Sequence, residues 1–193
     1  MITPPVVAPE GSPVRIIDRG RLAEIGMYVL LVPILMFFLA LASAYIVRHG
    51  FGEAWIRVEL PPLLWGNTVV LLFSSLAFEY GRRARKQQVQ RWLWTSLTMG
   101  TLFLLGQWVV WQQLLANGIR IESSGHSAFF YLLTAAHGIH LLAGLLGLFL
   151  ATMWPSHGRW NLGRPEAIRV AAIYWHFMAV LWLGIVLLLA LGR

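Results

Sequence analysis

Residues 127–147 read SAFFYLLTAAHGIHLLAGLLG, and this stretch decides the fold of the chain. As an α-helix it is about 30 Å long, which matches the hydrocarbon thickness of a bilayer. It nevertheless contains two histidines, a threonine and three glycines among its apolar residues. Polar side chains inside a membrane need partners, and small residues allow another helix or a lipid chain to come close. The stretch therefore predicts a transmembrane helix that packs through a polar and small stripe.

The position of this stripe follows from the helical period of about 100° per residue. Phe130, His137 and Gly144 are spaced seven residues apart, so successive members differ in direction by only about 20°. His140 and Gly147 lie close by, while the rest of the helix circumference is mainly aliphatic. We expect the two histidines and Gly144 to contact protein or lipid, either within this chain or in another subunit.

The composition assigns the class of the protein. Of the 193 residues, 58% are hydrophobic and 12% are charged, and ten are tryptophan. A water-soluble domain of this size could not bury so much apolar surface, so we expect an integral membrane protein. The formal charge of +7 does not indicate nucleic-acid binding, because most arginines lie in short connections between apolar segments. The lack of cysteine excludes disulfides, thiolate metal sites and thiol nucleophiles.

The alternation of apolar and polar segments predicts an all-α integral membrane bundle of five transmembrane helices. A cytoplasmic tail at residues 1–20 comes first, and it has no apolar core of the kind that a cleaved signal peptide needs. Residues 21–193 then form a single membrane domain. The predicted spans are about 26–47, 60–80, 92–116, 126–153 and 168–191.

The basic residues predict the orientation of the bundle. Residues 81–91 contain five Lys or Arg and residues 155–169 contain three, whereas residues 48–59 contain two and residues 117–125 one. Connections on the cytoplasmic side of a membrane carry the excess of Lys and Arg. We therefore expect the N-terminus in the cytoplasm and the C-terminus outside.

Histidines within membrane spans raise the hypothesis of a haem-bearing electron-transfer protein. His140 and His176 fall at similar depths on successive helices, which is one requirement of a bis-histidine haem site. A pair of haems would need four matched histidines, and the spans supply three. We expect these histidines to serve packing and hydrogen bonding instead. Nucleophile–base arrangements, phosphate loops and metal-spacing motifs are absent from the sequence, so no catalytic, cofactor-binding or metal-binding residue is predicted.

A charged group is predicted at the inner end of the second span. Glu79 precedes Arg82 and Arg83 by three and four residues, and side chains at these spacings meet on a helix. A proton-carrying acid would be expected deeper in the membrane, among polar neighbours. The pattern favours an interfacial ion pair.

Polar and aromatic residues on the other spans also indicate helix contacts. Gly100, Gln107 and Trp111 share one face of the third span, at separations of seven and four residues. The candidate packing or lipid-contact residues are His137, His140, Gly144, Trp175, His176, Gln107, Trp111 and Asn67. The tryptophans assigned to aromatic belts at the membrane surfaces are Trp92, Trp94, Trp108, Trp111, Trp154, Trp160 and Trp175.

Several motifs, taken in order and at their spacing, resemble subunit III of cytochrome c oxidase, within the haem-copper oxidases. The resemblance covers nearly all of the chain after the tail. Its strongest motifs are Phe129-Phe130 to Thr134, His137-Gly138-Ile139-His140 with Gly144, and Tyr174-Trp175-His176-Phe177 with Val180 and Trp182. The weaker ones are Ala44-Tyr45 with Arg48, Trp55, Asn67-Thr68 with Ser74-Ser75, and Gly100 with Gln107 and Trp111. The five spans resemble the shorter bacterial form, which lacks the first two helices of the seven-helix version.

The resemblance implies an accessory, non-redox subunit of a terminal respiratory oxidase in a bacterial plasma membrane. Haem and copper would reside in partner subunits and not in this chain. The main partner would be the catalytic subunit I, and electrons would arrive from cytochrome c through subunit II. Tightly bound phospholipid is also implied. The expected role is to stabilise subunit I and to support its proton uptake while oxygen reduction drives proton pumping.

The sequence departs from the family pattern at two places. Pro33-Ile34 stand where the family commonly has a Ser-Glu pair, and Met178-Ala179 stand where an aspartate is common after the Trp-His-Phe motif. Packing and lipid binding are compatible with these changes, whereas a carboxylate-based proton antenna inside these helices is not. The alternative hypothesis is an accessory subunit III-like protein of a nitric oxide reductase or a quinol oxidase.

Overall fold

The computed structural model of the chain describes residues 19–50, 60–153 and 165–191. The helices are α1 (Arg19–Gly50), α2 (Pro62–Arg83), α3 (Lys86–Ala116), α4 (Gly125–Met153) and α5 (Pro165–Leu191). The described residues contain no strand. Each of the five helices is long and apolar enough to cross a membrane, which confirms the predicted all-α bundle and makes the chain a multi-pass membrane protein.

The helices extend beyond the predicted spans, mainly at one end of the molecule. α1 begins at Arg19 instead of about residue 26, and α3 begins at Lys86 instead of about residue 92. Hydropathy marks only the segment inside the hydrocarbon, whereas backbone hydrogen bonding continues into the headgroup region. Of the predicted tail, only Arg19 and Gly20 fall within the described residues, and both belong to α1.

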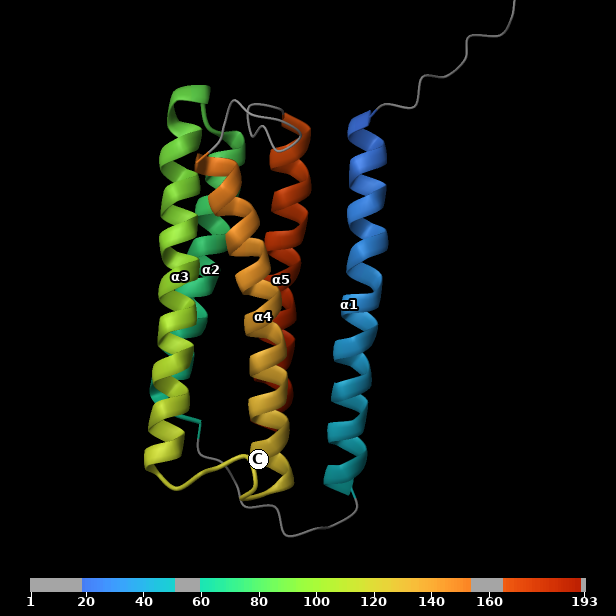
Figure 1. Cartoon of the computed structure of the whole chain (residues 1–193), viewed down its shortest axis with the longest axis vertical. Helices are drawn as coiled ribbons and strands as arrows, with labels where there is room; N and C mark the ends of the chain where they lie inside the picture. The colour runs from blue at the N-terminus through green and yellow to red at the C-terminus, as the bar shows by residue number, and fades with distance from the viewer. Residues whose placement is uncertain (1–18, 51–59, 154–164, 192–193) are drawn as a thin grey trace, which may run out of the picture.

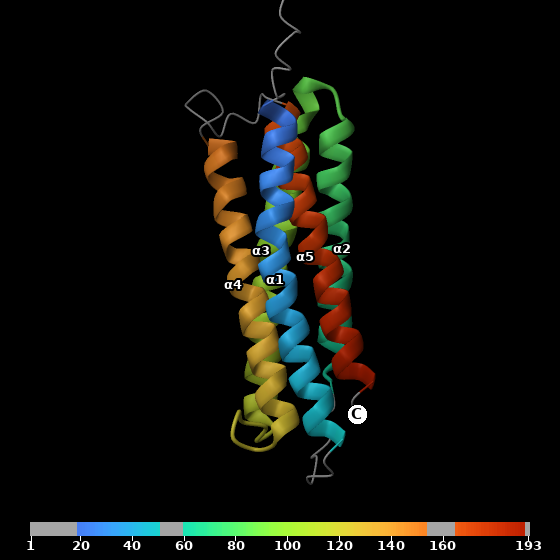
Figure 2. The same ribbon diagram turned by 90° about the vertical axis from the view of Figure 1, so that its right-hand side faces the viewer.

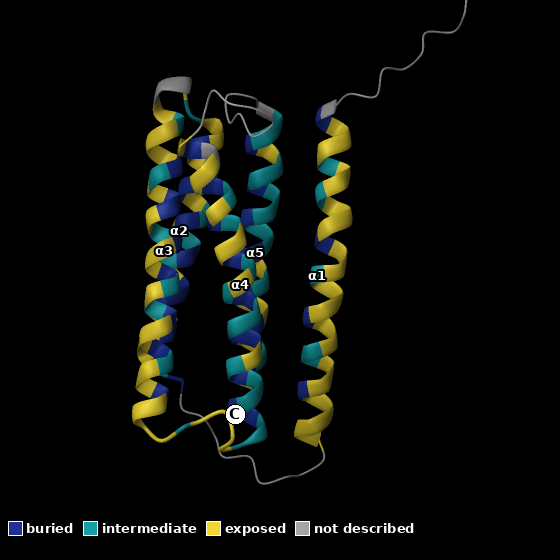
Figure 3. Ribbon diagram, viewed as in Figure 1, coloured by how far each residue is buried: buried dark blue, intermediate teal, exposed yellow. Residues whose placement is uncertain are grey.

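Four helices enclose the interior of the bundle. α2 packs on α3, α3 on α4, α4 on α5 and α5 on α2, so these helices form a closed ring of neighbours. α1 packs on the outside of this ring, against α4 and α5 (Figures 1 and 2). Figure 3 shows buried positions along the inward faces of α2 to α5, whereas α1 is exposed over most of its surface.

The chain order places the start of α1, the α2–α3 connection and the start of α5 at one end of the bundle, and most of the Lys and Arg residues of the described helix ends lie there. The start of α1, the α2–α3 connection and the start of α5 lie together at the upper end in Figure 1. This arrangement agrees with the odd number of spans, because the start of α1 and the end of α5 lie at opposite ends of the bundle. Which side is cytoplasmic remains a prediction from the distribution of Lys and Arg.

Candidate functional site in the interior of the bundle

Three helices meet around the indole of Trp175 on α5. Its Nε1 donates a hydrogen bond to Oγ of Ser74 on α2, at 3.1 Å. Ser74 and Ser96 of α3 exchange hydrogen bonds with each other's backbone carbonyls, at 2.8 and 3.0 Å. Gly100 makes room for the indole, because a Cβ built there would lie 2.9 Å from Trp175 Cζ2. The assignment of Trp175 to an aromatic belt was therefore wrong: the side chain is buried where α2, α3 and α5 meet.

His137 of the sequence stripe is buried between α3 and α5. Its ring centroid lies 5.0 Å from that of Trp182 on α5 and 6.0 Å from that of Phe103 on α3. Trp182 in turn donates its indole N–H to Oγ1 of Thr68 on α2, at 3.0 Å. Neither ring nitrogen of His137 has a hydrogen-bond partner among the described residues. The imidazole thus fills space at the centre of the bundle.

A second polar contact joins α2 to α3 at a neighbouring level. Asn67 is buried, and its Nδ2 donates to the carbonyl of Phe103 at 2.9 Å and more weakly to Oε1 of Gln107 at 3.4 Å. One turn farther along α3, the Trp111 indole donates to Oγ1 of Thr134 on α4, at 3.1 Å. The Oε1 atom of Gln107 is therefore directed at α2, and the indole N–H of Trp111 is directed at α4.

The rest of the stripe on α4 divides between two neighbours. His140 keeps a ring nitrogen on its own helix, with Nδ1 2.7 Å from the carbonyl of Ala136, and its ring lies against Phe38 of α1. Gly144 lies so close to Tyr174 of α5 that a Cβ built there would be 2.6 Å from Cε1 of the tyrosine. The Gly147 site differs, because a Cβ there would meet nothing within 4 Å.

The charged group at the end of α2 is a cluster, and it also includes a histidine from α5. Arg82 Nε lies 2.8 Å from Glu79 Oε2, and Arg83 Nε lies 2.6 Å from Glu79 Oε1. His176 joins them, with Nε2 3.4 Å from Glu79 Oε2 and Nδ1 2.6 Å from Oγ of Ser75. Sequence spacing indicated the contacts of Glu79 with the arginines, which lie on the same helix. It did not indicate the contact with His176, because the two residues lie on different helices and 97 residues apart in the chain.

Two contacts of α1 had no counterpart in the sequence interpretation. Near one end of the bundle, the Tyr45 hydroxyl lies 2.9 Å from Nδ1 of His126 on α4. Near the other end, Glu24 Oε1 lies 2.7 Å from Nε of Arg169 on α5. The available signal was a polar residue close to each helix end, but its partner depends on which helices are neighbours.

The two histidines considered for haem each use a ring nitrogen within the protein, His140 on its own helix and His176 on Ser75. Within the described ranges, no group of three or more His, Cys, Asp or Glu residues is arranged to hold a metal ion. That this chain binds no haem or copper stays a prediction. The polar interior instead defines a class of protein, a multi-pass helical bundle whose buried hydroxyls, amides and indoles join one helix to the next.

Comparison with known proteins then gives the family. The chain matches the family described as cytochrome c oxidase subunit III over residues 11–191. Cytochrome c oxidase subunit 3 of Thermostichus vulcanus is 31% identical over 171 residues, which cover 82% of each chain. The protein of the same name from Corynebacterium diphtheriae is 28% identical, with 89% of each chain covered. The probable cytochrome c oxidase subunit 3 of Mycobacterium leprae is 30% identical over 90% of each chain. The chain belongs to the cytochrome c oxidase subunit III family.

Proposed function

We propose that this chain is the accessory subunit III of a bacterial cytochrome c oxidase, without redox chemistry of its own. The observation that carries the proposal is the family match over residues 11–191, supported by relatives that bear the name of this subunit. The oxidase complex reduces oxygen, and this subunit contributes to it by binding beside the catalytic subunit I, with subunit II delivering electrons from cytochrome c. The nitric oxide reductase and quinol oxidase alternatives are not favoured, because the matched relatives carry the oxidase name.

The interior of the bundle supports a structural role for the candidate residues. Trp175 and Trp182 hold α5 on α2 through Ser74 and Thr68. Buried hydrogen bonds between transmembrane helices favour one arrangement of the helices, because the donors and acceptors have no water to turn to. A subunit with such an interior presents a fixed outer surface to a partner protein and to bound phospholipid.

This chain has no carboxylate at the two positions where the family commonly has an acid. Its support for proton uptake therefore cannot come from a proton-carrying group at those positions. Ile34 on α1 is partly buried, and Met178 and Ala179 on α5 are buried, so apolar side chains occupy both places. We propose that this chain supports proton uptake by stabilising subunit I.

The experiment is to purify the protein through an affinity tag on this chain from native membranes in mild detergent. Subunits I and II should co-purify with it, together with a haem spectrum and oxygen-reducing activity with cytochrome c as donor. A deletion strain shows what the subunit adds: the remaining complex should keep its haem spectrum and initial rate but lose activity sooner over successive turnovers. The chain expressed alone should carry no stoichiometric haem. A Soret band that disappears on changing His140 or His176 would instead establish the electron-transfer hypothesis.

The proposed orientation has its own test in reporter fusions. Fusions at residues 86 and 160 should report the cytoplasm, and fusions at residues 56 and 122 should report the outside. A periplasmic signal at residue 86 would reverse the orientation without changing the assignment to the oxidase.

A further inference from the structure

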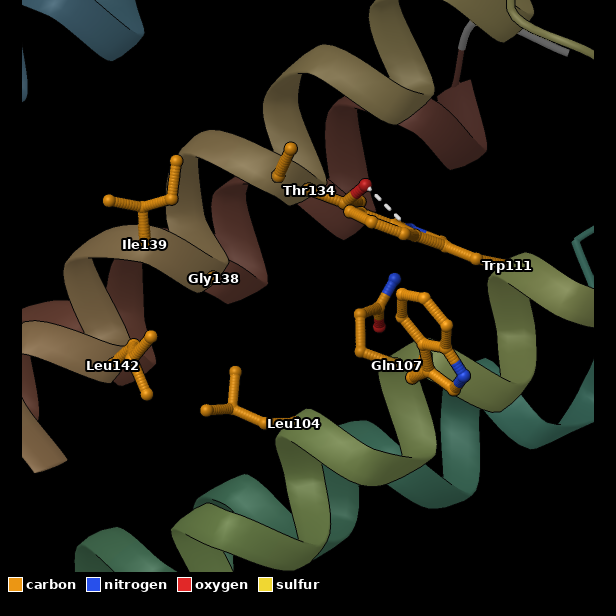
Figure 4. Close-up of a pocket in the computed structure, with 9 residues that line it drawn as sticks. Leu104, Gln107, Trp111, Thr134, Gly138, Ile139 and Leu142 are labelled. Carbon is orange, nitrogen blue, oxygen red and sulfur yellow. Dashed lines mark hydrogen bonds between the residues drawn. The ribbon is translucent and has the colours of Figure 1, made fainter.

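A groove of about 300 Å³ runs between α3 and α4 on the surface of the bundle that faces lipid or a partner. Its walls are almost wholly apolar, and Trp108, Ile139 and Leu142 on its rim are more than half exposed. Figure 4 shows Leu104 and Leu142 at one end of the groove and Trp111 with Thr134 at the other. The groove is therefore open along its length, and its two ends differ in polarity.

The polar end holds a buried hydrogen-bond donor without an acceptor. Gln107 lines the groove, is only 4% exposed, and its Nε2 has no partner among the described residues. The orientation of the Gln107 amide follows from its contact with Asn67. Nδ2 of Asn67 is a donor, so it requires Oε1 of Gln107 to face it. Nε2 is thereby turned away from α2, toward Trp111 (Figure 4). A buried donor left unpaired is unfavourable, so it calls for an acceptor from outside the chain.

The depth of this donor in the membrane indicates what kind of acceptor reaches it. Gln107 lies nine residues before Ala116, the end of α3, which is about 14 Å along the helix. Gln112 and Gln113 are exposed amides five and six residues past Gln107, about 8 Å nearer that end of α3, and exposed amides belong at the edge of the hydrocarbon and not within it. Gln107 therefore sits just beneath the boundary, at the level that Trp108 and Trp111 also occupy as residues typical of the interface. Ester carbonyls of phospholipids lie close to this boundary.

We propose that this groove binds one diacyl phospholipid of the leaflet on the side of the α3–α4 connection, with an ester carbonyl accepting a hydrogen bond from Gln107 Nε2. The acyl chain extends toward the membrane centre along Leu104, Ile139 and Leu142. The order of polar and apolar groups favours a lipid over a partner helix. In a phospholipid the ester carbonyl is followed, toward the membrane centre, by an apolar acyl chain, and in the groove the Gln107 donor is followed in the same direction by apolar walls. The proposal names a site for the phospholipid binding included in the proposed function, and it rests on that function.

Two substitutions test the site, each with a matched control. Gly138→Leu fills the groove, since a Cβ at Gly138 meets only Leu104 Cδ2, at 3.9 Å, and its control is Gly147→Leu on the same helix, where a Cβ meets nothing within 4 Å. Gln107→Leu removes the donor, and its control is Gln112→Leu, an exposed amide on the same helix. The complex purified through this chain is placed in nanodiscs that contain phosphatidylglycerol with a diazirine in one acyl chain. A second preparation uses the diether analogue, which has the same chains but no ester carbonyl.

We expect photolabelling of the α4 peptide that contains Ile139 and Leu142, with the diester lipid preferred about tenfold over the diether, a difference of about 1.4 kcal/mol. Gly138→Leu should abolish the labelling and Gln107→Leu should abolish the preference, while both controls behave like the unaltered complex. Equal labelling by the two lipids overturns the role of Gln107. A groove that stays unlabelled, or a photoreactive residue at Ile139 that captures another subunit, overturns the lipid site. Co-purification of subunit I and haem in the same samples tests the proposed function separately.

Discussion

α1 and the ring formed by α2 to α5 solve the problem of crossing a membrane in two different ways. The most apolar 18-residue window of α1 is the most hydrophobic of the five spans, yet only 11% of it is buried within the protein. The corresponding window of α5 is 44% buried. The polar contacts of α1 named above lie near its ends, at Glu24 and Tyr45, whereas α5 makes polar contacts along its middle through Trp175 and Trp182.

This difference shows what apolar character means in a membrane protein. Lipid tails are as apolar as leucine, so hydrophobicity alone gives a helix no reason to leave lipid for protein. The helices that pack most closely are held by hydrogen bonds and by small residues such as Gly100, which lets Trp175 approach α3. α1 is therefore a lipid-facing helix attached to the outside of the four-helix ring, and the predictions below test this difference between α1 and the ring.

The largest effect is expected from Trp175→Ala, which removes the side chain shared by α2, α3 and α5. In water-soluble cores such a truncation costs about 3–5 kcal/mol, but in a bilayer the separated helix still keeps its side chain in hydrocarbon, so we expect about 2–3 kcal/mol. The measurement is the free energy of unfolding of the purified subunit, titrated from mild detergent into a denaturing one. Trp65→Ala is the control, because Trp65 on α2 is 48% exposed. An equal loss of unfolding free energy for Trp175→Ala and Trp65→Ala would contradict the view that the ring is held together by its buried contacts.

Gly144→Leu should be the next largest, because it places a side chain where Tyr174 already lies. A Cβ alone would be 2.6 Å from Cε1 of the tyrosine, and overpacking of this kind costs about 1–3 kcal/mol. We expect α4 to separate partly from α5, and the subunit to be lost from the oxidase during purification while the haem spectrum is retained. Gly147→Leu should leave subunit content unchanged, because its site is open. Loss of the haem signal with full subunit content would instead make the stripe a cofactor site.

The sequence was sufficient for the number and type of the helices, because a run of apolar residues long enough to span a bilayer has few other uses. It also placed Glu79 beside Arg82 and Arg83, since contacts within one helix depend only on spacing. Contacts between helices were harder to predict. The partners of Trp175 and His137 depend on which helices are neighbours and on how each is rotated, and one sequence contains neither quantity. The groove beside Gln107 was missed for the same reason.

Tyr45→Phe should loosen one end of α1 without disturbing the packing of α2 to α5. The change removes the hydroxyl that bonds to His126 but keeps the aromatic ring, whose centroid lies 5.6 Å from that of Phe129. Hydrogen bonds between transmembrane helices average about 0.6 kcal/mol, so we expect a cost near that value. Hydrogen exchange should quicken in the last turns of α1 and stay unchanged in α3. Tyr28→Phe, at an exposed position on the same helix, is the control.

The smallest effect is expected from Glu24→Gln, at the opposite end of α1. Its ion pair with Arg169 is short, at 2.7 Å, but the arginine side chain is 47% exposed and the glutamate 25%. Water and salt screen exposed charges, so such pairs contribute between nothing and about 1 kcal/mol, and we expect less than about 0.5 kcal/mol here. The cost should vanish at high salt, whereas the effect of Tyr45→Phe should not change with salt. Exchanging the charges in Glu24→Arg with Arg169→Glu should restore the hydrogen-exchange protection of the first turns of α1. If Glu24→Gln instead released α1 from α4 and α5 at every salt concentration, α1 would depend on this one contact, and its description as a lipid-facing helix attached by several contacts would be wrong.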